Sequence, residues 1–283
     1  MASFTNFATL SYNGGTTNSN IVTGEILEAL TAVKTAVSAN YSAGDRITYA
    51  LSLVNTGTAA ITDYTVTDNL GGYTVGANTV YPLAYNAGTV RYYINGVLQA
   101  APTVTAGPPL TVTGLTVPAG GSAVLIYETT ATPVAPLATG SSITNTATIT
   151  GGGLTTPITA QATVETATSA DLSISKALSP TTVTENGQIT YTFVISNTGN
   201  TEATATGNVV ITDTFAPILR NIAVTYNGTA WTEGTNYTYN AATGVFTTLA
   251  GQITVPAASF TQNTDGTFTV TPGTATLVIT GTV

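Results

Sequence analysis

Residues 171–200 read DLSISKALSPTTVTENGQITYTFVISNTGN. Two runs in this stretch alternate apolar and polar side chains, which is typical of strands with one buried face, and Pro, Asn and Gly separate the runs as turn residues do. Short alternating runs bounded by turn signals continue along the whole chain, and no stretch has a convincing helical period. The sequence therefore predicts an all-β protein.

An internal repeat divides the chain. The motifs Ile-Thr-Tyr at 47–49 and Asn-Thr-Gly at 55–57 recur 142 positions later, and the only two lysines, Lys34 and Lys176, have the same offset. A repeat of this length indicates two copies of one domain, and short strands with regular turns are typical of a β-sandwich. We expect three parts: an N-terminal donor strand or hairpin over 1–24, and tandem Ig-like sandwiches over 25–166 and 167–283.

The composition excludes several classes of function. The 283 residues include no Cys and no His, which removes disulfides, most zinc sites, Cys nucleophiles and His-based triads. Charged residues make up 6% of the chain against a typical share of roughly 25%, and the net charge is −8. Nucleic acid and anionic lipid are therefore unsuitable partners, and no apolar run is long enough to insert into a membrane. We expect no enzyme activity, no cofactor and no metal.

The two copies differ at their ends. The second copy reaches Val283 at the point equivalent to Ala131, so it has no counterpart of SITNTATIT at 142–150. A sandwich without that strand exposes unpaired backbone groups beside apolar side chains. The segment SFTNFATLSYNGGTT at 3–17 resembles SITNTATITGGGLTT at 142–156. It is therefore the expected donor strand, and its inward-facing residues are Phe4, Asn6, Ala8 and Leu10.

The donor strand is expected to fill another copy of the chain rather than its own second copy. Residues 142–176 complete one domain and lead into the next, so the domain completed by 3–17 should precede the first copy. Folding back would require crossing a domain of roughly 33 Å, given strands of about ten residues. Head-to-tail exchange between copies does not close and generates a filament. The alternative is that 3–17 resembles 142–156 only by chance, because the chain is rich in Thr.

The repeat resembles a known family, the conserved domain of unknown function that occurs in tandem on bacterial and archaeal surface proteins. The resemblance rests on residues 171–200, on the Thr-Asp pairs at Asp68 and Asp213, and on Ser142–Thr150. It is weak over 73–115 and 216–270. The family implies an Ig-like sandwich in an extracellular, stalk-like or adhesive protein without enzyme activity.

Strand parity places a lysine, an aspartate and an asparagine on the buried face of each copy. An isolated buried charge either shifts its pKa or finds a partner. The combination resembles the spontaneous isopeptide sites of Gram-positive pilins and collagen-adhesin domains, which implies that a desolvated lysine attacks an Asn side chain beside a protonated acid. Two sets are expected: Lys34 with Asn145 and Asp68, and Lys176 with Asn6 of the neighbouring copy and Asp213. Glu128 is a rival acid in the first copy, and a non-covalent ion pair with a hydrogen-bonded Asn is the alternative.

These observations favour a structural subunit of an extracellular filament, such as a pilus or appendage, whose partner is itself. A cell or spore surface is the expected location, and no receptor is indicated. The alternative is a fragment of a monomeric surface adhesin or surface-layer protein that binds glycan or a host protein. Exposed strand tyrosines would supply such a glycan surface, although strand aromatics more often form cross-strand packing pairs.

Overall fold

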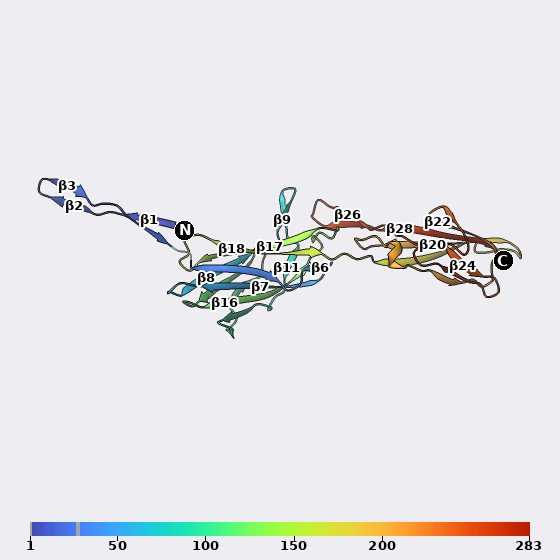
Figure 1. The fold of residues 1–283 in the computed structure, drawn as a ribbon, viewed down its shortest axis with the longest axis horizontal. Coiled ribbons are helices and arrows are strands. Elements are labelled where there is room, and N and C mark those ends of the chain that lie inside the picture. Colours follow the sequence, from blue (N-terminus) through green and yellow to red (C-terminus); the bar gives the residue numbers. More distant parts are fainter. Residues whose placement is uncertain (1, 27–28) are drawn as a thin grey trace. The chain divides into compact units, whose positions relative to one another are not determined.

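The computed structural model describes residues 2–26 and 29–283 and contains two compact units. Unit 1 comprises Met1–Pro136 and Ser142–Glu165, and unit 2 comprises Leu137–Ser141 and Thr166–Val283. Within the described ranges the only helical segment is a single 3-10 turn, Ala205–Gly207, and no helix is long and apolar enough to span a bilayer. The predicted all-β class is confirmed (Figure 1).

The first sheet of unit 1 carries Lys34 on its edge strand. Its order is β13 (Val97–Leu98), β12 (Arg91–Ile94), β16 (Ser122–Ala131), β7 (Arg46–Asn55), β5 (Leu30–Ala36), with β11 (Leu83–Tyr85) also paired to β16. All pairs are antiparallel, and Lys34 on β5 lies opposite Leu51 on β7. Alternate residues of β7 and β16 are buried, which is the pattern of a sheet with one face against a core.

The second sheet of unit 1 carries Asp68 and Asn145 on adjacent central strands. Its order is β14 (Thr103–Thr105), β15 (Leu110–Val117), β8 (Ile61–Asp68), β17 (Ser142–Gly151), β18 (Ile158–Thr166), β6 (Asn40–Tyr41). A small separate hairpin pairs β9 (Tyr73–Val75) with β10 (Asn78–Val80). The inward faces of the two large sheets form the core, so the lysine and its predicted partners enter it from opposite sides.

Unit 2 repeats the first sheet more completely than the second. Its larger sheet has the order β19 (Leu172–Ser179), β20 (Gln188–Asn197), β28 (Gly273–Thr282), β22 (Arg220–Tyr226), β23 (Thr229–Trp231). Three strands form the other sheet, in the order β21 (Thr212–Thr214), β25 (Val245–Thr248), β24 (Tyr237–Asn240). A separate hairpin pairs β26 (Ser259–Gln262) with β27 (Phe268–Thr271). Trp231 is partly buried against the unit 2 core.

The N-terminal segment is a long two-stranded hairpin, shown in dark blue in Figure 1. Its base pairs β1 (Ala2–Asn6) with β4 (Val22–Ile26), and its tip pairs β2 (Thr9–Tyr12) with β3 (Gly15–Asn18). The turn between β2 and β3 includes Gly14 at φ +144°, and β3 begins with Gly15 at φ +159°. Every residue from 4 to 23 is exposed, so the hairpin holds together mainly through backbone pairing.

A buried asparagine ends β7 in unit 1 and the corresponding strand β20 in unit 2. The Asn55 amide nitrogen donates to the carbonyl of Ala59 at 2.8 Å and to that of Pro118 at 3.1 Å, while its oxygen accepts from the amide of Gly57 at 2.9 Å. Asn197 makes the equivalent set in unit 2, with Thr201, Pro256 and Gly199. The repeated Asn-Thr-Gly motif therefore fastens two loops to the end of a core strand.

We expect Asn55→Ala and Asn197→Ala each to lower the free energy of unfolding by about 1–3 kcal/mol. Each substitution leaves the loop carbonyls and one backbone amide without their hydrogen-bond partner at a buried position. Urea denaturation followed by circular dichroism measures this change. Asn40→Ala, at an exposed position of β6, is the matched control and should leave the midpoint unchanged. A midpoint equal to that of the unsubstituted chain in both core variants would contradict the clamp.

Candidate functional site

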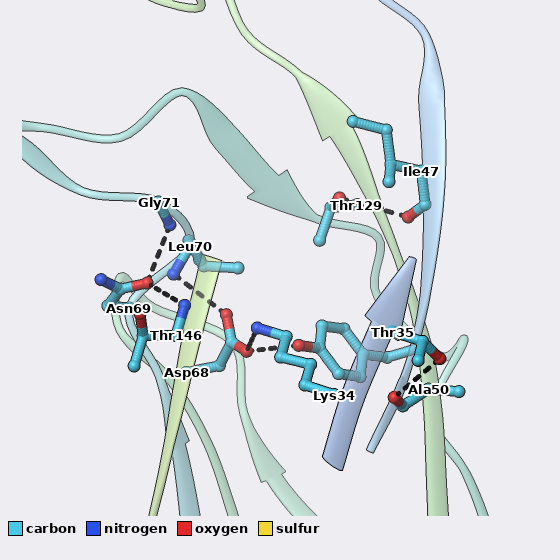
Figure 2. Close-up of polar contacts among 11 residues, drawn as sticks. Lys34, Thr35, Ile47, Ala50, Asp68, Asn69, Leu70, Gly71, Thr129 and Thr146 are labelled. Atoms are coloured by element: carbon cyan, nitrogen blue, oxygen red, sulfur yellow. Dashed lines mark hydrogen bonds and ion pairs between the residues drawn. The ribbon is translucent and has the colours of Figure 1, made fainter. Parts of the chain in front are cut away.

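Lys34 and Asp68 form an ion pair in the core of unit 1. The Lys34 Nζ lies 2.5 Å from Asp68 Oδ2, and the two side chains are 0% and 1% exposed. Figure 2 shows the amine directed at the carboxylate, whose other oxygen accepts the backbone amide of Leu70 at 3.0 Å. The pair joins β5 of one sheet to the end of β8 in the other, as strand parity predicted for their burial.

Two stacked tyrosines surround this pair. The Tyr127 hydroxyl donates to Asp68 Oδ2, and the Lys34 Nζ lies 4.8 Å from the ring centre of Tyr49. Burial lowers the pKa of Lys34 from 10.5 to about 8, against the opposing attraction of Asp68. The amine is therefore much easier to deprotonate than an exposed lysine. A neutral amine is the form of lysine that acts as a nucleophile.

Asn145 lies in the same cluster and is fully buried. Its strand is in register with β8 so that Ala147 lies opposite Asp68, which puts Asn145 two residues along on the same face. Burial raises the pKa of Tyr49 and Tyr127, and the nearby Asn145 amide acts against that rise. Neither polar atom of the Asn145 side chain is aligned with a hydrogen-bond partner among the described residues. A buried primary amide without an aligned partner is costly, which makes Asn145 a candidate for chemistry with the neighbouring Lys34 and Asp68.

The rival acid Glu128 lies outside this cluster. It forms an exposed ion pair with Arg46, with 3.6 Å between Nη1 and Oε2. Exposed pairs of this kind contribute little to stability. Asp68 is thus the acid that the structure brings to Lys34. No group of three His, Cys, Asp or Glu in the described chain is placed to hold a metal ion.

The equivalent pair in unit 2 is open to solvent. Lys176 Nζ contacts Asp213 Oδ2 and lies 4.5 Å from the ring centre of Tyr191, which repeats the position of Tyr49. The side chains of Lys176 and Asp213 are 40% and 18% exposed, whereas those of Lys34 and Asp68 in unit 1 are buried. Lys176 is therefore only partly covered in the single chain, and its burial beside Asn6 of a neighbouring copy stays a prediction.

The difference in exposure between Lys34 and Lys176 follows from the number of strands beside the aspartate. In unit 1, β8 lies between β15 and β17, whereas the described part of unit 2 gives β21 only β25 as a neighbour. Every residue of β19 is exposed, including Leu172 at 37%, while the equivalent Leu30 of β5 is 3% exposed. Unit 2 therefore has an open edge on β21 and an uncovered apolar face on β19.

The predicted donor residues are exposed on the N-terminal hairpin. Phe4 is 54% and Leu10 is 64% exposed, and Asn6 and Ala8 are exposed as well. Their sequence counterparts on β17 are all buried in the core of unit 1: Ile143, Ile149, Asn145 and Ala147. The same pattern of side chains is thus buried on β17 of unit 1 and exposed on the N-terminal hairpin.

Only the structure places Tyr49 and Tyr127 at the lysine, although their parity in the sequence already puts them on the inward face. Tyr49 and Tyr127 share the inward face with their buried strand neighbours and are directly paired across β7 and β16. Tyr191 repeats Tyr49, but Ile279 stands opposite it where unit 1 has Tyr127. The Tyr127 hydroxyl that donates to the aspartate is therefore specific to unit 1.

Comparison with known proteins finds no matching family model and no matching curated protein. Solved structures with some similarity include an N-terminal domain of the Streptococcus gordonii adhesin Sgo0707, with 14% identity and a TM-score of 0.36 over 48% of this chain and 32% of that one. BcpA, the major pilin subunit of Bacillus cereus, gives 14% and 0.36 over 96% and 73%. ACE19, a collagen binding subdomain of the Enterococcus faecalis surface protein ACE, gives 10% and 0.32 over 50% and 99%. The chain thus spans about a third of the adhesin domain.

Burial of Lys34 predicts that stability rises with pH. Between pH 8 and about 10 the unfolded chain binds more protons at this lysine than the folded chain does, so the free energy of unfolding increases by up to about 1.4 kcal/mol per pH unit. We expect this rise in urea titrations of Asn145→Ala, in which the amine has no amide to attack. Lys34→Met in the same background is the control and should lack the rise. Equal slopes in the two variants would contradict the lowered pKa.

Proposed function

We propose that this protein is the structural subunit of an extracellular filament, such as a pilus or appendage on a cell or spore surface. In this proposal the N-terminal hairpin of one copy completes unit 2 of the next, so that subunits join head to tail. The observation that carries it is the match between the exposed residues of β1 and β2 and the buried residues of β17, combined with the open place beside β21. An exposed strand edge of this kind is a template for another strand.

Unit 1 supplies the register of the junction. Ala147 lies opposite Asp68 and Ile149 opposite Val66, so the equivalent pairs are Ala8 with Asp213 and Leu10 with Ile211. Asn6 then enters beside Lys176 as Asn145 does beside Lys34. Burial of Phe4 and Leu10 contributes up to a few kcal/mol each at about 25 cal/mol per Å². Each ladder hydrogen bond adds about 1 kcal/mol, so the junction resists dilution.

The lysines and asparagines are further proposed to form isopeptide bonds. Transfer of one proton from Lys34 Nζ to Asp68 within the ion pair leaves a neutral amine, which attacks Cγ of Asn145. The carboxyl that forms donates a hydrogen bond to the Asn carbonyl oxygen and so makes the carbon more electrophilic. The Nζ–Cγ bond forms, the Cγ–Nδ2 bond breaks, and the proton lost from Nζ leaves with the departing ammonia. Lys176 and Asn6 of the neighbouring copy undergo the same exchange beside Asp213, which makes the junction covalent.

Deleting residues 2–17 should abolish filaments and leave unit 1 folded, because unit 1 completes its own sheets with β17 and β18. Negative-stain electron microscopy and sedimentation measure assembly, and circular dichroism measures folding. A finer pair of variants is Phe4→Asp, at the position of buried Ile143, and Thr5→Asp, at the position of exposed Thr144. Only Phe4→Asp should block assembly. Normal filaments from the deletion variant would refute strand donation.

Mass spectrometry tests the covalent bonds. A proteolytic digest should contain a peptide that joins Lys34 to Asn145 within one chain and another that joins Lys176 to Asn6 between chains, each lighter than the sum of its parts by one ammonia. Asn145→Ala should remove the first peptide and keep the second, and Asn6→Ala the reverse. Intact masses without any loss of ammonia would leave the ion pairs as the complete interaction.

A further inference from the structure

We propose that the element donated between copies is a two-stranded hairpin, in which β4 enters unit 2 together with β1. This inference rests on the proposed function and specifies its interface. A single donated strand would only occupy the edge of β21. A hairpin extends the sheet by two strands and also reaches the loop that follows β19.

The register of the hairpin carries the inference. Within β1 and β4, Ser3 lies opposite Glu25, and in unit 1 the corresponding Ser142 lies opposite Glu165. Asn6 lies opposite Val22 as Asn145 lies opposite Ala162. The N-terminal hairpin therefore reproduces the pairing of β17 with β18 at its base, and not only the sequence of β17.

The side chains on the two strands are complementary in volume. In unit 1 the buried pair is Ile143 with Val164, and at the same place the hairpin has Phe4 with Gly24. The Phe4 ring covers Gly24 so closely that a Cβ there would clash with it. A larger residue on one strand is balanced by the smallest on the other. This exchange is expected if both strands pack against one core, because a core accepts volume-conserving substitutions best.

In unit 1 the strand β18 also pairs with β6, and the segment of unit 2 that corresponds to β6 forms no such pair among the described residues. The strand β6, which follows β5, pairs with β18, and the amide of Glu165 donates to the carbonyl of Ala39 at 2.8 Å. With the lysines aligned, Ala39 to Tyr41 correspond to Thr181 to Val183, a segment that forms no strand and leaves Val183 38% exposed. In the filament, β4 pairs with this segment, and the amide of Glu25 bonds to the carbonyl of Thr181.

The face of β4 that enters the core is defined by β18. Ala160, Ala162 and Val164 are buried on β18, while Thr163 between them is exposed. Val22 therefore faces the unit 2 core, and Thr23 faces solvent. In the single chain both residues are exposed, so neither is needed for the folding of unit 1.

The test compares Val22→Asp with Thr23→Asp in the full chain. We expect Val22→Asp to raise the concentration of unassembled protein at least about tenfold, because it would bury an unpaired carboxylate. Thr23→Asp places the same charge on the same strand and should stay within about twofold of the unsubstituted chain. Val22→Ala, which reproduces the residue of unit 1, should assemble normally. Sedimentation of polymer from subunit measures all three variants.

Amide hydrogen exchange gives an independent measurement. Exchange at Thr181–Val183 should slow on assembly of the unsubstituted chain, because β4 covers these residues. If Phe4→Asp blocks assembly while Val22→Asp assembles like Thr23→Asp and exchange at Thr181–Val183 is unchanged, a single strand is donated and the hairpin inference is wrong. If Phe4→Asp assembles normally, strand donation itself fails. The two failures are therefore distinguishable.

Discussion

The structure depends on covering the inward face of the lysine-bearing edge strand. This strand brings an ammonium group and apolar side chains to the rim of the sandwich, where the opposite sheet must reach them. In unit 1 it does so through β8 and β17, and Lys34 is enclosed with Asp68. In unit 2 the corresponding strand is β19, and all its residues are exposed. Burial of one amine is thus decided by whether a strand lies beside the aspartate.

The two units serve as an internal control for each other. They share the lysine, the aspartate, the first tyrosine and the asparagine clamp. Among the described residues, only unit 1 has a buried asparagine on a strand beside the aspartate. Solvent reaches Lys176 because nothing in the described chain occupies the place of β17. A neighbouring copy that filled this place would provide the missing amide and the missing burial together. Assembly and nucleophile activation would then be a single event.

The sequence predicts the repeat and the inward residues well, since both follow from local patterns. A period of two residues places Lys34, Asp68 and Asn145 on buried faces, and a fixed offset aligns Lys176 with Lys34. The contact of Tyr127 with Asp68 is harder to predict from the sequence, because it depends on how the two sheets stack. The exposed fraction of Lys176 in the single chain also depends on the neighbouring strands, which parity within one strand does not describe. The pairing of β1 with β4 depends on the register of the hairpin β2–β3 between them, which a pattern of side chains does not specify.

The ladder of unit 2 has a consequence for mechanical load. Leu172 at the start of β19 pairs with Asn197, and Asn197 pairs with Gly273 at the start of β28. The end of β28 at Thr282 lies at the far end of the same ladder, opposite Gln188. Tension applied between Leu172 and Thr282 therefore runs along the strands and loads the hydrogen bonds of β19 with β20 and of β20 with β28 in shear at once. A sheet strained in this direction cannot unzip one bond at a time, so it yields only when many bonds break together.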